Sequence, residues 1–204
     1  MTMKTLDACK LLDTHRGDAF VVCTMGAMNA LDKLPVNPLA MACVPLMGGA
    51  ASIGLGLALA RPERKVFVFD GDASLLMELG GLVSIAHAKP KNLFHFVFNN
   101  SIQFAGLGNL DTPGARRADM VAMASACGFD SSQRITNLED LEARLPSVLN
   151  GPAPSFVELV VEYDNPSLGI ENPAVEMTDE RFSRMGDEIR RIRRHLGCDA
   201  EIRS

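Results

Sequence analysis

Two polar segments of the chain each follow a short apolar run, and their side chains could together bind a metal ion. Asp72 stands just after the run Val66–Phe69, and Asn100 follows the run Phe94–Phe98. A carboxylate and an amide supply hard oxygen donors of the kind that Mg²⁺ binds, usually together with phosphate oxygens and water. The alternative is that Asp72 and Ser74 only cap a helix, as Asp and Ser often do.

The elements that must position these side chains are two strands and the helix between them. Both apolar runs have strand length and are rich in Val and Phe, which favours β-structure, and a helical pattern starts near Ser74. Such a strand–helix–strand unit is parallel with a right-handed crossover, so both polar segments should emerge at the carboxyl edge of one sheet. Ligands of open α/β sheets bind at that edge, and the first turn of the helix would direct its N–H groups toward an anion there.

Strand and helix patterns alternate along the chain, without an internal repeat. We therefore expect a doubly wound α/β fold, in which a mostly parallel sheet of roughly five or six strands is flanked by helices. We also expect a single domain over residues 1–204. The other expected strands cover residues 19–24, 134–136 and 156–161, and the expected helices cover residues 5–12, 50–60, 119–127, 138 onward and about 178–196.

Proline and asparagine set several expected boundaries. Three prolines lie within residues 35–45, which predicts that this segment is mostly loop. Asn137 should cap the helix that follows it, and Pro146 should end or kink that helix. The last helix has a single apolar stripe among many charged residues, so we expect it to pack on its own sheet or on a neighbouring chain.

Composition excludes several classes of function. The net charge of the 204 residues is −5, with no basic run of the kind that binds nucleic acid. No apolar stretch is long enough to span a membrane, and the N-terminus lacks a signal-peptide core. The five cysteines are scattered, without a CxxC pair. Reduced thiols in a cytoplasmic protein are therefore expected, with no membrane or nucleic-acid partner.

The two polar segments also resemble a known motif. Gly71-Asp72-Ala73 and Asn99-Asn100 are similar to the two halves of the thiamine-diphosphate motif, which reads GDG and then NN. The wider segment that carries the resemblance is VPLMGGAASIGLGLALARPERKVFVFDGDASLLMELGGL. It resembles the diphosphate-binding domain of the group formed by the sulfopyruvate decarboxylase β subunit and phosphonopyruvate decarboxylase. Ala73 departs from the motif, because its methyl group stands where Gly would let the backbone approach the diphosphate closely.

The resemblance implies a ligand set for Mg²⁺ and for thiamine diphosphate. The metal ligands would be the side chains of Asp72 and Asn100 and the backbone carbonyl of Ile102. Met47 matches the bulky residue that lies beneath the thiazolium ring and bends the cofactor, although it could also be a plain core residue. The residues expected to contact the cofactor are Gly26, Met47, Gly48, Gly49, Gly71, Asp72, Ala73, Ser74, Asn100 and Ile102. For Gly26, which we expect in a loop after the first strand, a tight turn is an equal alternative.

A carboxylate that activates the cofactor is the part that this chain is expected to lack. In the family that the chain resembles, this carboxylate comes from a pyrimidine-binding domain. About 40 residues remain beyond the diphosphate-binding region, which is too few for a second domain, and Glu78 is expected to face away from the cofactor. We therefore expect the activating Glu on a partner, the pyrimidine-binding (α-type) subunit, with self-association as well. The chain alone would be inactive and would hold no catalytic residue of its own.

The function that the resemblance implies is decarboxylation of a small 2-oxo acid, releasing carbon dioxide and an aldehyde. The segment after Asn100, which includes Gln103, is expected to be a long loop that acts as a lid. Arg116 and Arg117 could meet a substrate anion or could simply be solvated. Two other functions stay open: a different thiamine chemistry, such as carboligation or an oxidoreductase reaction, and a non-catalytic phosphate-ligand-binding module.

Overall fold

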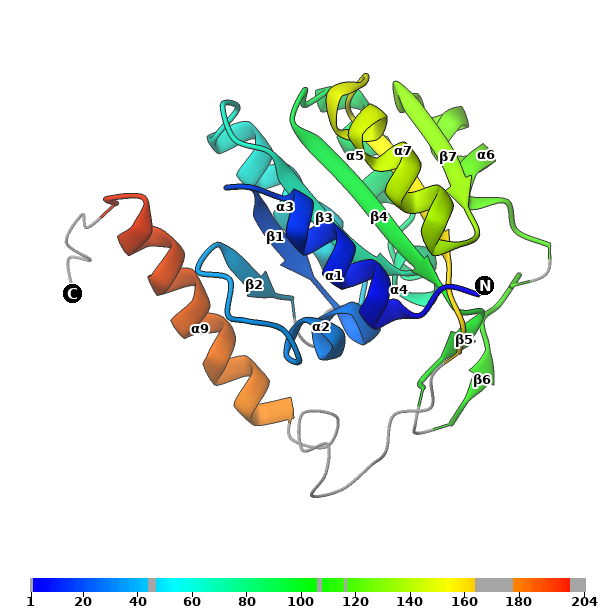
Figure 1. The fold of residues 1–204 in the computed structure, drawn as a ribbon, viewed down its shortest axis with the longest axis horizontal. Coiled ribbons are helices and arrows are strands. Elements are labelled where there is room, and N and C mark those ends of the chain that lie inside the picture. The colour runs from blue at the N-terminus through cyan, green and yellow to red at the C-terminus, as the bar shows by residue number, and fades with distance from the viewer. Residues whose placement is uncertain (1, 44–46, 106–107, 116, 164–177, 199–204) are drawn as a thin grey trace.

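The centre of the fold is a parallel β-sheet of six strands, in the order β2-β1-β3-β4-β8-β7 (Figure 1). The computed structural model describes residues 2–43, 47–105, 108–115, 117–163 and 178–198. The strands are β1 (Phe20–Cys23), β2 (Ala40–Ala42), β3 (Val66–Gly71), β4 (Leu93–Asn99), β7 (Ser131–Ile135) and β8 (Ser155–Val160). This sheet confirms the predicted parallel α/β architecture.

Helices cover both faces of the sheet. One face carries α1 (Thr5–His15), α2 (Met25–Leu31) and α7 (Leu138–Asn150), of which α1 and α7 lie in front of the sheet in Figure 1. The other face carries α3 (Gly49–Ala60), α4 (Asp72–Met77), α5 (Gly80–Ala88) and α6 (Met120–Cys127). Among the described helices, none has the combination of length and apolarity needed to cross a membrane.

Each strand contributes apolar side chains to both faces of the sheet, because successive side chains of a strand point to opposite faces. In β3, Phe67 and Phe69 face α1, α2 and α7, whereas Val66 and Val68 face the other layer. The ring of Phe96 in β4 packs edge-on against Phe67 and Phe69, with centroid distances of 5.4 and 5.9 Å. These buried aromatic side chains fix the two central strands against each other.

The direction of sheet growth changes at β1. Strand β1 pairs with β2 on one side and with β3 on the other. After β2 the chain therefore passes over β1 to form β3, and the later strands of this sheet are added on the β3 side. In doubly wound sheets the carboxyl ends beside such a switch point diverge and leave room for a ligand. The segments that leave β1 and β3 therefore border the expected ligand edge.

The C-terminal helix α9 (Thr178–His195) lies along the edge strand β2 (Figure 1). Glu188 accepts a hydrogen bond from the backbone N–H of Ala42 at 2.7 Å, and Arg191 donates to the carbonyl of Ala40 at 3.2 Å. Ile192 is buried in the apolar layer that contains α3. The predicted amphipathic helix thus packs on its own sheet, with its polar side chains satisfying the outer backbone groups of β2.

Three predicted loops contain regular structure instead. Residues 35–45 include strand β2, which forms because Pro35 and Pro38 precede the strand and leave its hydrogen bonds to β1 intact. The segment after β1 is helix α2, because Met25 adopts φ 51° and turns the chain directly into a helix. The segment after Asn100 also differs, since β5 (Ile102–Gln103) and β6 (Leu110–Asp111) form a two-stranded antiparallel sheet.

The predicted helices differ from the observed ones in two places. The helix after β3 begins at Asp72 rather than near Ser74, and it is interrupted at Glu78, so that α4 and α5 are separate. Helix α7 continues through Pro146, which neither ends it nor removes the packing of its buried face, formed by Leu141, Leu145, Val148 and Leu149. That packing outweighs the hydrogen bond that proline cannot make. The predicted cap of α7 is confirmed, because Asn137 Oδ1 accepts from the Asp140 N–H at 2.8 Å.

Candidate functional site

The candidate site lies at the carboxyl ends of the neighbouring central strands β3 and β4. Gly71 pairs with Phe98 across these strands, so Asp72 and Asn100 leave the sheet at the same edge. The backbone N–H of Asn100 lies close enough to the Asp72 carboxylate to stabilise its ionised form. The structure therefore brings together the two residues that the sequence singled out.

Asp72 is a buried carboxylate whose hydrogen bonds are incomplete. Its relative exposure is 2%, and its Oδ2 atom has no hydrogen-bond partner among the described residues. Burial raises the pKa of Asp72, although the Thr112 hydroxyl and the backbone N–H groups of Ala73, Asp72 and Asn100 counteract the increase. Burying an ionised oxygen without a partner is unfavourable. A cation bound to this oxygen would offset that unfavourable free energy.

A tight turn after β4 holds the other two expected metal ligands. Asn100 Oδ1 accepts a hydrogen bond from the backbone N–H of Ile102 at 3.0 Å, and Asn99 Oδ1 accepts from that of Ser101, also at 3.0 Å. Ser101 has φ 61°, in the left-handed region that non-glycine residues seldom adopt. Asn100 and Ile102 are half-buried, at the junction between the sheet and the β5–β6 hairpin. The site is therefore built on a constrained turn.

The glycine-rich segment meets the start of α4 at the same corner. Gly48 has φ 87°, precedes the first residue of α3, and donates its N–H to Ser74 Oγ at 2.7 Å. The first turn of α3, beginning at Gly49, has N–H groups without partners inside the helix, which suits an anion. Met47 is half-buried and belongs to neither buried apolar cluster of the described residues.

Ser74 does not have the capping role that was the alternative for it. Gly71 is the N-cap residue of α4 and receives no side-chain cap hydrogen bond, while Ser74 Oγ accepts from Gly48. Ala73 is buried, with 8% relative exposure. Gly71 lies beside Met25, because a Cβ built on Gly71 would come within 3.9 Å of the Met25 Cβ. The ends of β1 and β3 therefore border one corner, as the switch point predicts.

The surroundings of two residues at this corner differ from those that the sequence first suggested. Gly26 lies in the first turn of helix α2 rather than in a loop, which agrees with the turn given as its alternative. A Cβ built on it would meet no atom of the described chain within 4 Å, and its contact with the cofactor stays a prediction. Glu78 was expected to face away, but its Cβ lies 2.5 Å from the position of a Cβ built on Gly48. The break between α4 and α5 causes this, because it turns Glu78 toward the glycine-rich segment.

Thr112, which the sequence did not single out, adjoins Asp72. Its backbone N–H donates to the Ser101 carbonyl at 2.9 Å, and its side chain is 2% exposed. The Thr112 hydroxyl is near enough to Asp72 to lower the pKa of that carboxyl. The geometry between them is not that of a normal hydrogen bond, and the hydroxyl has no other partner within the described chain. Only pairing across the hairpin brings Thr112 to the site, so no local pattern could reveal it. An open hollow of about 340 Å³ lies beside it, lined by Asp111, Thr112, Pro113, Gly114, Ala115 and Arg117.

The donor set suits Mg²⁺ bound together with a phosphorylated ligand. In the described parts of the chain, no group of three or more His, Cys, Asp or Glu side chains could hold a metal by itself. Mg²⁺ commonly takes one or two protein carboxylates and completes its shell with phosphate oxygens and water. Asp72, with its unpartnered oxygen, and the amide of Asn100 fit that pattern. Exposed Arg117 lines the hollow, and Arg116 lies outside the described residues.

Comparison with known proteins agrees with this chemistry. Residues 22–159 match the family described as thiamine pyrophosphate enzyme, C-terminal TPP binding domain. A sulfopyruvate decarboxylase subunit beta from Methanothermobacter thermautotrophicus is 33% identical over 183 residues, which cover 89% of this chain and 95% of that protein. A phosphonopyruvate decarboxylase from Streptomyces viridochromogenes is 37% identical over 158 residues, which cover 74% of this chain but only 38% of that protein.

Solved structures give the same fold. An X-ray structure of a candidate thiamin diphosphate-dependent enzyme, isolated from Mycobacterium smegmatis, matches with a TM-score of 0.65 and 21% identity. The match covers 79% of this chain and 32% of that one, and at this identity it shows the fold alone. The chain thus corresponds to one part of the longer relatives and to nearly the whole of the Methanothermobacter beta subunit.

Proposed function

The chain belongs to the thiamine pyrophosphate enzymes, through their C-terminal TPP binding domain, and on this premise we propose that it is the diphosphate- and Mg²⁺-binding subunit of a 2-oxo acid decarboxylase. The observation that carries the proposal is the buried Asp72 carboxylate, whose Oδ2 lacks a partner in the described chain, beside Asn100 and the first turns of α3 and α4. The relatives are decarboxylases by name, which supports a carboxy-lyase.

Each group at the corner has a proposed role. Asp72, Asn100 and the carbonyl of Ile102 hold Mg²⁺, and the first turn of α3 from Gly49 onward binds the diphosphate. The Gly48 N–H already donates to Ser74, so Gly48 positions this turn, and its lack of a side chain leaves room for Glu78. When bound, thiamine diphosphate supplies the electron sink for decarboxylation.

Met47 and the β5–β6 hairpin have proposed roles around the cofactor. Met47 precedes the α3 turn and is half-buried outside both apolar clusters, so its side chain is available to support the thiazolium ring. The hairpin is joined to the site through Thr112 and Ser101, and it borders the open hollow. We propose that it covers the substrate and limits the access of water. The tie to Ser101 places the hairpin directly beside the proposed metal-binding turn.

A partner subunit completes the proposed enzyme. A relative that this chain covers almost entirely carries the name subunit beta, which implies a second kind of subunit. We propose that this partner is the pyrimidine-binding, α-type subunit and that it supplies the activating Glu. The active site would then form at the interface between subunits. Cytoplasmic location is part of the same proposal, and it fits five cysteines with no disulfide among them.

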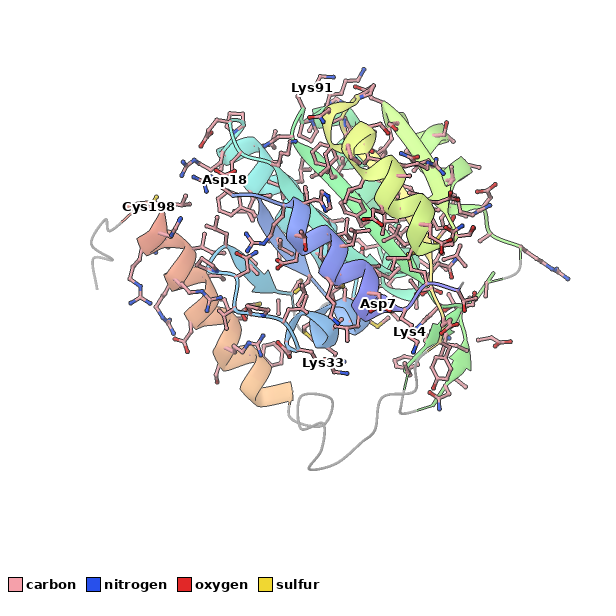
Figure 2. The ribbon with its side chains drawn as sticks, in the orientation of Figure 1. Lys4, Asp7, Asp18, Lys33, Lys91 and Cys198 are labelled. Carbon is pink, nitrogen blue, oxygen red and sulfur yellow. The ribbon has the colours of Figure 1, made fainter. Side chains whose placement is uncertain are left out.

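Calorimetry of cofactor binding tests the site. Thiamine diphosphate should bind to the wild-type chain with MgCl₂ and not with EDTA, and Asp72→Asn should weaken binding by roughly 100-fold or more. Asp18→Asn is the matched control. Asp18 is 78% exposed beside the amino end of β1, away from the site, and Figure 2 shows it on the outside of the fold. Unchanged affinity of the Asp72→Asn variant would contradict the proposed site.

Turnover tests the reaction and the divided active site. The purified chain should release no carbon dioxide from a series of 2-oxo acids, whereas the chain co-purified with its partner should release carbon dioxide and an aldehyde. A carboligation product in place of the aldehyde would identify a different thiamine chemistry. Robust decarboxylation by the chain alone would contradict the proposal that the activating Glu comes from a partner.

A further inference from the structure

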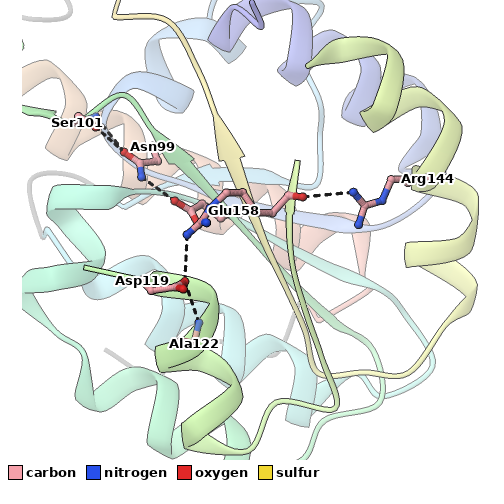
Figure 3. A network of polar contacts seen from close by, with 7 residues as sticks. Asn99, Ser101, Asp119, Ala122, Arg144 and Glu158 are labelled. Atoms are coloured by element: carbon pink, nitrogen blue, oxygen red, sulfur yellow. Dashed lines mark hydrogen bonds and ion pairs between the residues drawn. The ribbon is translucent and has the colours of Figure 1, made fainter. Parts of the chain in front are cut away.

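A second buried carboxylate, that of Glu158 in β8, contacts Asn99, the residue before the expected metal ligand Asn100. Its relative exposure is 2%, and it accepts hydrogen bonds from Asn99 Nδ2 and from Arg134 Nε, each at 2.7 Å (Figure 3). Arg134 also contacts Asp119 at 3.0 Å, and Asp119 caps α6 by accepting from the Ala122 N–H. A continuous series of polar contacts therefore joins the start of α6 to the end of β4.

The charge of Glu158 determines which way the Asn99 amide faces. A carboxylate can only accept hydrogen bonds, so the NH₂ group of Asn99 must point toward Glu158. The amide oxygen then points the other way, where it accepts from Ser101 N–H at 3.0 Å and from Ser101 Oγ at 3.2 Å. The pairing of Val97 with Glu158 makes this geometry possible, because Asn99 follows Val97 by two residues on the same strand face.

The Asn99 oxygen in turn holds the strained turn. Ser101 adopts φ 61°, a conformation that is unfavourable for a residue with a side chain unless surrounding contacts maintain it. The bonds from Ser101 to Asn99 and from Ile102 to Asn100 maintain it here. A reversed Asn99 amide would place a donor opposite the Ser101 N–H. The shape of the turn therefore depends on Glu158, although Glu158 does not reach it directly.

We propose that Glu158, with Arg134 as its ion-pair partner, is a positioning residue for the metal-binding turn. Glu158 fixes Asn99, Asn99 fixes Ser101, and the turn presents Asn100 and Ile102 to Mg²⁺. The inference rests on the proposed function, since it concerns the geometry of that metal site. Neither Glu158 nor Arg134 is proposed as a ligand, since Glu158 acts through Asn99 and Arg134 acts through Glu158.

Three variants test this relay by exchanging donors and acceptors. In Glu158→Gln one oxygen must serve both Asn99 and Arg134, and in Asn99→Asp two carboxylates face each other. In the double variant N99D/E158Q, the new amide at position 158 can donate to the new carboxylate at position 99 and can still accept from Arg134 through its oxygen. That carboxylate can in turn still accept from Ser101. Each single variant should weaken Mg²⁺-dependent binding of thiamine diphosphate by about 10- to 100-fold. The double variant should recover to within about threefold of wild type.

A readout without any ligand separates positioning from general stability. Amide hydrogen exchange of Ser101 and Ile102, measured by NMR on the full chain, should be faster in Glu158→Gln by about tenfold relative to the core of β3. Ile192→Ala is the control, because it removes a buried side chain at the opposite edge of the sheet. That variant should lower thermal stability without selectively accelerating exchange in the turn.

The outcomes distinguish this inference from the proposed function. If the wild-type chain binds no thiamine diphosphate but Glu158→Gln still accelerates exchange in the turn, the proposed function is wrong and the relay itself stands. If wild type binds the cofactor and Glu158→Gln binds it equally well, the inference is wrong. It is also wrong if the double variant binds no better than the single variants, or if Ile192→Ala weakens binding as much as Glu158→Gln does.

Discussion

The backbone N–H of Gly48 donates a hydrogen bond to Ser74 Oγ over 2.7 Å, although 26 residues separate the two in the chain. This bond joins the segment that begins α3 to the first turn of α4. Two helix starts therefore lie at one corner of the sheet, next to the Asp72 oxygen that has no partner in the described chain. An anion and a cation could be bound there together, since the helix starts favour negative charge and Asp72 favours positive charge.

Removal of the Ser74 hydroxyl should separate these two helix starts. Ser74 is fully buried, so Ser74→Ala would leave the Gly48 N–H without its acceptor, at a cost of roughly 1–3 kcal/mol in the free energy of unfolding. Urea denaturation followed by circular dichroism measures this change. Ser52→Ala is the control, because Ser52 is exposed and its hydroxyl makes a long contact of 3.5 Å with Glu78. Equal stability of the two variants would show that the Gly48 bond contributes nothing.

Two glycines of α3 should respond in opposite directions to the same substitution. A Cβ on Gly54 would come within 2.3 Å of Val68 Cγ2 in β3, so Gly54→Ala should destabilise the fold by about 1–3 kcal/mol. A Cβ on Gly56 would meet no atom within 4 Å, so Gly56→Ala should stabilise the helix by about 0.5–1 kcal/mol. Chemical denaturation of both variants checks the prediction. Destabilisation by Gly56→Ala would contradict the open space that the structure shows beside it.

Asp72 should make the metal-free chain less stable as the pH rises. Burial raises the pKa of this carboxyl above its ordinary value of 3.8. Its contribution to stability is therefore present below that value and is lost as the pH rises through the pKa of the folded state. In EDTA, Asp72→Asn should be more stable than wild type at neutral pH, and the difference should shrink in acid. Thermal unfolding across the pH range measures this, with Asp18→Asn expected to match wild type throughout.

The cysteines should differ sharply in reactivity. Burial raises the pKa of Cys43 to about 11, with further increases from Asp70 and Glu78, and the side chain is fully buried. Cys9 is equally buried, whereas Cys198 is exposed. Iodoacetamide at neutral pH should therefore modify Cys198 first and leave Cys9 and Cys43 unmodified until the chain unfolds. Mass spectrometry of native and urea-treated samples checks this order, which equal labelling of Cys43 and Cys198 in the native chain would contradict.

Local patterns in the sequence predicted the part of the fold that carries the site. Two apolar strands, each ending in polar residues, were sufficient to place Asp72 and Asn100 at one edge, because a parallel crossover leaves little choice of arrangement. The structure confirms that placement, and the comparisons confirm the thiamine-diphosphate resemblance. The assignment of individual ligands for Mg²⁺ and the cofactor stays a prediction.

The features that the sequence did not reveal depend on contacts between distant segments. Strand β2 has only three residues, and it is stabilised by β1 on one side and by α9 on the other. Thr112 reaches Asp72 only because the β5–β6 hairpin folds back. Glu158 did leave a local signal, since it is the one charged residue within the apolar strand Ser155–Val160. Its partners, Asn99 and Arg134, come from two other strands and could not be paired from the sequence.

Helix α9 limits how copies of this chain can assemble. Glu188 and Arg191 use the outward-facing N–H of Ala42 and carbonyl of Ala40, which an added strand would otherwise need. A neighbouring molecule cannot extend the sheet beyond β2 while α9 stays in place. A homodimer formed by joining two sheets edge to edge would therefore have to join through β7, the strand at the opposite border.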